Sequence, residues 1–103
     1  MQAETMKLDG RIDAFTVEPL EEWLAENAAA EPAKLVINLE EVTFIDTKAV
    51  TVLVSGLKRC RQNGGDLVLS ALSSPVRVIM ELMRLDKAFT IVDDDVAAMA
   101  VFT

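Results

Sequence analysis

The sequence predicts an α/β fold: a single domain with a small mixed, mainly parallel sheet of four to five strands and about four helices. Short apolar and β-branched segments alternate along the chain with segments whose apolar residues recur at helical spacing. The connections between them are short, which favours successive strands that run parallel in one sheet. At 103 residues, the chain fits one domain spanning residues 1–103.

The first part of the chain predicts a short strand followed by a helix. Residues Thr5–Leu8 alternate weakly and end at Asp9-Gly10, a strong turn dipeptide. From Val17 onward apolar residues recur at helical spacing, and Thr16 is positioned to cap that helix. We expect the helix to end before Glu31-Pro32.

The middle of the chain predicts a buried strand that leads into a long amphipathic helix. Residues Lys34–Leu39 are almost continuously apolar, as in a strand covered on both faces. The following helix has a buried stripe of Val50, Leu53, Val54, Leu57 and Cys60. Its outward face carries Lys48, Thr51, Lys58, Arg59 and Gln62. The helix should stop at Asn63-Gly64-Gly65, a typical C-terminal signal.

The last third predicts two further strand and helix pairs. Leu67–Leu69 is a short buried strand, and Ser73-Ser74-Pro75 supplies cap and first-turn residues for a third helix. A strand at Thr90–Val92 precedes Asp93–Asp95, whose carboxylates suit the positive end of a terminal helix. The predicted order is therefore β-α-β-α-β-α-β-α.

Composition excludes several classes of partner and site. The formal net charge of -7 repels nucleic acid and anionic membrane surfaces. Neither a signal peptide nor an apolar span of about 18 residues is visible, so we expect a cytoplasmic protein without membrane insertion. The absence of histidine removes the usual acid-base and nucleophile pairs. With a single cysteine, we expect no metal, no cofactor and no enzymatic activity.

The turn Phe44-Ile45-Asp46-Thr47-Lys48 is the predicted working surface, because a buried strand there feeds directly into a helix. Asp46 and Thr47 are both suitable N-caps. Lys48 places a positive charge at the positive end of the helix, which costs about 0.3 to 1 kcal/mol. This placement suggests that the lysine reaches toward Asp46 or toward an acidic partner.

Three segments carry a resemblance to a known family: Leu35-Val36-Ile37-Asn38-Leu39, Val42-Thr43-Phe44-Ile45-Asp46-Thr47 and Asn63-Gly64-Gly65-Asp66-Leu67-Val68-Leu69. The chain resembles the STAS family of anti-sigma factor antagonists. The resemblance implies a bacterial STAS-like domain that binds an anti-sigma factor, usually a serine/threonine kinase of the histidine-kinase ATPase fold. It also implies partner switching in transcription regulation, in which the unphosphorylated protein binds and the phosphorylated protein releases its partner.

The loop departs from the family pattern where phosphorylation usually occurs. Lys48 matches the usual phosphoacceptor position, and a lysine cannot be phosphorylated by that chemistry. Thr47 therefore remains as the phosphorylation candidate, which would make this chain a phosphoprotein; the alternative is a domain that has kept the binding surface and lost the switch. Asp13 matches a family turn residue near the partner surface, although aspartate is also a common turn former. The expected partner-binding residues are Asp13, Asp46, Thr47, Lys48 and Thr51.

Two alternative functions stay open from the sequence. Similar domains serve as scaffolds of stress-signalling complexes or as accessory subunits of lipid-transport ATPases. A receiver-type phosphoaspartate domain is also conceivable with Asp46, but the chain lacks an acidic pair after its first strand and a lysine after its last.

The start of the chain is short for the family, because only nine residues precede Gly10. We therefore expect the first strand to be very short or missing. A missing strand would leave an exposed sheet edge that can pair with a second copy, so a homodimer also stays open.

Overall fold

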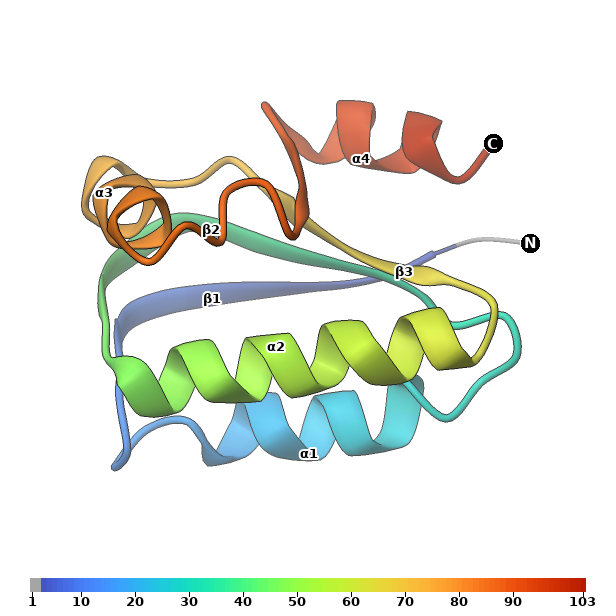
Figure 1. Ribbon diagram of the computed structural model, residues 1–103, viewed down its shortest axis with the longest axis horizontal. Helices are drawn as coiled ribbons and strands as arrows, with labels where there is room; N and C mark the ends of the chain where they lie inside the picture. Colours follow the sequence, from blue (N-terminus) through green and yellow to red (C-terminus); the bar gives the residue numbers. More distant parts are fainter. Residues whose placement is uncertain (1–2) are drawn as a thin grey trace.

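The computed structural model describes residues 3–103 and contains four strands that alternate with four helices (Figure 1). The elements are β1 (Glu4–Ile12), α1 (Glu18–Asn27), β2 (Lys34–Ile45), α2 (Thr47–Gln62), β3 (Asp66–Ser70), α3 (Ser74–Leu82), β4 (Thr90–Val92) and α4 (Asp95–Val101). One sheet has the order β1-β2-β3-β4, and all neighbouring strands are parallel. The predicted α/β class and order of elements are confirmed, with a sheet that is fully parallel within residues 3–103.

The sheet is covered on both faces. Helices α1 and α2 lie side by side against one face, while α4 lies over the other face and α3 lies beside β2 (Figure 1). Leu35, Ile37 and Leu39 of β2 belong to the main core beneath α1 and α2. The alternate residue Val36 packs with Val68 and with Ala98 of α4. Burial on both faces explains why this strand reads as a continuous apolar run.

The expectation that the first strand is very short or missing was wrong. β1 extends over nine residues and pairs with β2 along its length. Asp9-Gly10 does not reverse the chain. Gly10 lies inside the strand and adopts a φ of +67° there. The register with β2 shifts on either side of Asp9-Gly10, between Lys7 and Asp9 and between Gly10 and Arg11. The glycine thus accommodates an irregularity of the strand, and the argument for a homodimer through a missing strand loses its premise.

The predicted cap of α1 was also wrong. Val17 occupies the N-cap position and provides no side-chain hydrogen bond. The Thr16 hydroxyl instead donates to the Arg11 carbonyl at 2.7 Å and accepts from the Asp13 amide at 2.9 Å. Thr16 therefore closes the loop between β1 and α1, and its hydroxyl bonds with Arg11 and Asp13.

The acidic residues at the start of α4 have two different functions. The Asp94 carboxylate caps the helix by accepting from the Ala97 amide at 2.8 Å. Asp95 lies against the sheet, where its Oδ1 accepts from Asn38 Nδ2 at 3.0 Å and from Ser70 Oγ at 2.6 Å. Asp95 thereby fixes α4 to β2 and β3, a role that the sequence did not reveal.

Candidate partner-binding surface

Asp46 caps α2, and Thr47 does not. The backbone of Asp46 is extended, with φ −105° and ψ −177°, and its Oδ1 accepts from the Ala49 amide at 2.9 Å. Thr47 occupies the first helical position. Of the two capping residues that the sequence offered, the aspartate is used, and this leaves the Thr47 hydroxyl outside the cap.

The second carboxylate oxygen of Asp46 connects the turn to the loop between β1 and α1. Oδ2 accepts from the Ala14 amide at 3.1 Å, and the Asp46 amide donates to the Ile12 carbonyl at 3.3 Å. Both oxygens of this carboxylate therefore accept backbone hydrogen bonds. Such an aspartate is a structural anchor rather than the free nucleophile that a receiver-type phosphoaspartate requires.

Asp13 shapes the loop that Asp46 holds. Its Oδ1 accepts from the Phe15 amide at 2.9 Å, and its Oδ2 lies 3.5 Å from Arg11 Nε. The hydrogen bond from the Phe15 backbone, assisted by Thr16 and Arg11, holds the pKa of Asp13 below its ordinary value. Asp13 thus acts as a turn former, and the turn lies directly beside the N-terminus of α2.

Phe15 is a feature of this surface that the sequence interpretation missed. Its side chain is 95% exposed at the loop held by Asp13 and Asp46. Exposed aromatic side chains on ordered loops are frequent anchors in protein interfaces. The available signal was an aromatic residue in the turn segment between Asp13 and Thr16, where nothing in the local pattern places it in the core.

The hydroxyls of Thr47 and Thr51 differ in whether they are hydrogen-bonded within the helix. The Thr51 hydroxyl donates to the Thr47 carbonyl at 2.8 Å and is thereby tied to the helix backbone. The Thr47 side chain is exposed, and its hydroxyl makes no hydrogen bond within residues 3–103. Thr47 is therefore the accessible hydroxyl at this helix terminus.

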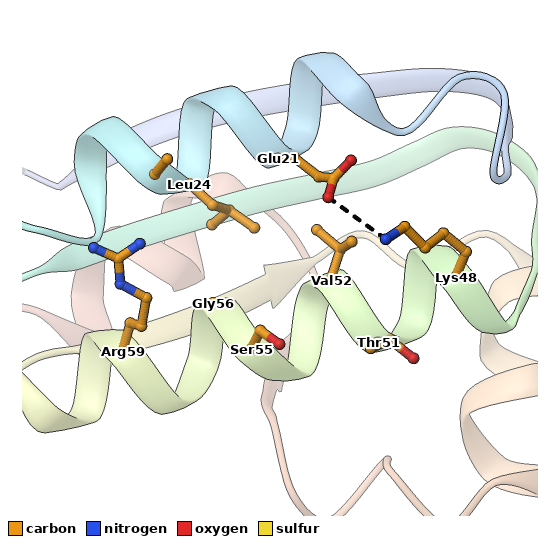
Figure 2. Close-up of a pocket in the computed structure, with 9 residues that line it drawn as sticks. Glu21, Leu24, Lys48, Thr51, Val52, Ser55, Gly56 and Arg59 are labelled. Atoms are coloured by element: carbon orange, nitrogen blue, oxygen red, sulfur yellow. Dashed lines mark ion pairs between the residues drawn. The ribbon is translucent and has the colours of Figure 1, made fainter.

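Lys48 pairs with α1 rather than with Asp46. Its Nζ lies 3.6 Å from Glu21 Oε2, and both side chains remain about half exposed (Figure 2). The expected contact with Asp46 does not form because that carboxylate is held by the amides of Ala49 and Ala14. An ion pair this exposed contributes at most about 1 kcal/mol, so an acidic partner can compete for Lys48.

The acidic side chains and Cys60 are the remaining candidates for a metal site or a nucleophile. Within residues 3–103, no cluster of three or more histidine, cysteine or acidic side chains is arranged to hold a metal ion. Cys60 lies in the core on the inner side of α2, where burial raises the pKa of its thiol to about 11. The thiol is consequently protonated near neutral pH, whereas nucleophilic cysteines need a lowered pKa.

No helix in the described part of the chain is both long and apolar enough to cross a membrane.

Comparisons with known proteins assign the family. The STAS domain profile matches residues 3–98. The anti-sigma-B factor antagonist of Listeria monocytogenes is 34% identical over 76 residues, covering 74% of this chain and 67% of that protein. The anti-sigma-B factor antagonist of Staphylococcus aureus is 29% identical over 80 residues, covering 78% and 74%.

A solved structure shows the same fold. An anti-sigma-factor antagonist (STAS) domain protein from Planctomyces limnophilus superposes with a TM-score of 0.84 and 23% identity, covering 96% of this chain and 90% of that one. The sequence resemblance is thus confirmed over nearly the whole described chain, including the strand, turn and helix around Asp46. The chain belongs to the STAS domain family.

Proposed function

We propose that this protein is an anti-sigma factor antagonist-like partner-switching protein. Its partner is an anti-sigma factor, a serine/threonine kinase of the histidine-kinase ATPase fold, bound through the loop and helix beginning at Asp46. The names of the Listeria and Staphylococcus relatives support the class of partner. Sigma factors act on RNA polymerase, so the proposed place of action is the cytoplasm.

The observation that carries the proposal is the surface around the start of α2. Asp46 holds two loops together, and this order presents Phe15, Thr47 and Lys48 as exposed neighbours of one fixed turn. A surface ordered before binding loses little conformational freedom when a partner docks. Asp13 contributes by shaping the loop, and Thr51 lies one turn further along the same helix.

Thr47 is the proposed switch residue. A phosphate on its hydroxyl adds about 1.5 to 2 negative charges at the first turn of α2, where the helix dipole favours them. Lys48 is adjacent and only weakly held by Glu21, so it can also turn toward such a phosphate. The modification would therefore leave the domain folded and act on the partner, which meets a changed charge on its binding surface.

Incubation with the captured kinase and ATP, followed by phosphopeptide mapping, tests this proposal. We expect modification at Thr47 and none in a Thr47→Val variant. Both Ser55 and Ser74 are exposed and serve as internal alternatives. Modification at either serine would refute the loop as the switch, and capture that recovers no kinase-fold partner would count against the proposed function itself.

A further inference from the structure

An open groove of about 200 Å³ runs between α1 and α2 and begins at the proposed partner surface. Lys48 stands at one end and Arg59 at the other, both on the side of α2 that faces α1 (Figure 2). They are 11 positions apart in one helix, which separates their Cα atoms by about 16 Å. The length of the groove is therefore about three helical turns.

The floor of the groove is apolar because the helices approach closely there. Leu24 of α1 and Val52 of α2 line it together with Gly56. A Cβ atom at position 56 would lie 2.9 Å from Leu24 Cδ1, so the glycine makes room for the leucine side chain. The result is an open apolar floor between two parallel helix walls, which is the shape that a third helix fits.

The charged residues that line the two walls differ in sign: Glu21 lies on the α1 wall, and Lys48 and Arg59 lie on the α2 wall. α1 as a whole contains four glutamates and no basic residue. α2 contains no acidic residue and has four basic side chains, Lys48, Lys58, Arg59 and Arg61. In a chain with a net charge of -7, α2 is thus a local basic surface. Within residues 3–103, Arg59 forms no ion pair, while Lys48 has only the weak pair with Glu21.

We propose that the α1–α2 groove is a docking site for an amphipathic helix of the partner, with two carboxylates about three turns apart facing Lys48 and Arg59. Small or apolar side chains between these carboxylates contact the floor. The flank that faces α1 is basic or uncharged, because Glu21 on that wall repels a second acidic stripe. The inference rests on the proposed function only in assigning this surface to a protein partner.

Fluorescence anisotropy with a labelled helical peptide of about 18 residues tests the groove. The probe carries two glutamates three turns apart with leucine and alanine between them, and matched probes replace both glutamates with lysine or place them one turn apart. We expect only the first probe to bind, with affinity that falls as salt rises. Amide shifts in nuclear magnetic resonance spectra should map to Val52, Ser55 and Gly56.

Charge reversal gives the matched controls. Arg59→Glu should weaken binding of the glutamate probe roughly tenfold or more, whereas Lys87→Glu makes the same change in net charge elsewhere and should leave binding unchanged. Equal binding to wild type and Arg59→Glu, no binding of the glutamate probe, or shifts outside α1 and α2 would overturn the inference. Light scattering that shows a dimer lost in Arg59→Glu would overturn it in favour of a second copy as the occupant.

These results are separable from the proposed function. If the glutamate probe fails but the captured kinase still modifies Thr47, only the groove assignment fails. If the probe binds in the groove but capture recovers no kinase-fold partner, the groove stands and the class of partner is wrong.

Discussion

Replacing Asp46 with alanine removes two hydrogen bonds that connect separate parts of the proposed surface. The first is the cap to the Ala49 amide at 2.9 Å, and the second is the tether to the Ala14 amide at 3.1 Å. Loss of an N-cap costs about 1 kcal/mol. Loss of a partly exposed hydrogen bond to a carboxylate costs about 1 to 2 kcal/mol more. We therefore expect Asp46→Ala to lower the free energy of unfolding by about 2 to 3 kcal/mol.

Urea unfolding followed by circular dichroism measures this loss, which corresponds to a decrease in Tm of roughly 10 to 20 °C for a domain of this size. Asp46→Asn separates the two bonds. Its side-chain oxygen can still cap α2, but its amide nitrogen cannot accept from Ala14, so we expect a loss of about 1 kcal/mol. Hydrogen exchange should then accelerate at Ala14 and stay slow at Ala49.

Thr47→Ala is the control for this reasoning. Because the Thr47 side chain takes no part in the cap, the substitution should change the unfolding free energy by no more than about 0.5 kcal/mol. A loss at Thr47 equal to the loss at Asp46 would refute the assignment of Asp46 as the cap. It would also remove the main reason for treating the Thr47 hydroxyl as free to be modified.

Three further outcomes follow from the packing and electrostatics. Asp95→Ala strands the buried amide and hydroxyl donors on β2 and β3, so urea unfolding should show a loss of about 2 to 4 kcal/mol, well above the effect of a surface substitution. Gly65→Ala should lower the free energy of unfolding by about 3 kcal/mol, because the added Cβ would meet the Ala33 carbonyl. Gly56→Ala should change it by under about 1 kcal/mol, because its added Cβ meets only side-chain atoms of Leu24, which can move. The pKa of Asp13 is lower in the folded protein than the ordinary carboxyl value of 3.8, so the ionised carboxylate stabilises the fold above that pH. This stability is lost as pH falls through the lower folded value. The free energy of unfolding of Asp13→Asn should therefore decline less steeply with acid in this range than that of the wild type.

The sequence was most informative where a local pattern and its burial agree. The continuous apolar run of β2 and the stripe of α2 predicted both elements, because each is determined by which faces the core covers. Gly10 shows the opposite case. Asp9-Gly10 predicted a turn that ends the first strand, but only the pairing with β2 decides whether such a pair ends a strand or interrupts its register.

The candidate surface also combines features that the sequence predicted with contacts that it did not predict. Asp46 was recognisable as a cap from its position before the helix, although Thr47 was an equal choice until the geometry was known. The contact of Asp46 with Ala14 spans 32 positions, and Lys48 meets Glu21 on another helix. Such contacts depend on how α1 and the first loop pack beside α2. Local spacing contains no information about that packing, and this is also why Phe15 was missed.

Partner affinity shows whether the start of α2 is the surface that binds the partner. Isothermal titration of the captured kinase-fold partner compares wild type with Lys48→Glu, using Lys87→Glu as the control of equal net charge. We predict that Lys48→Glu weakens binding by roughly tenfold or more and that Lys87→Glu binds like wild type. Equal affinity for all three proteins would contradict the assignment of this turn as the partner-binding surface.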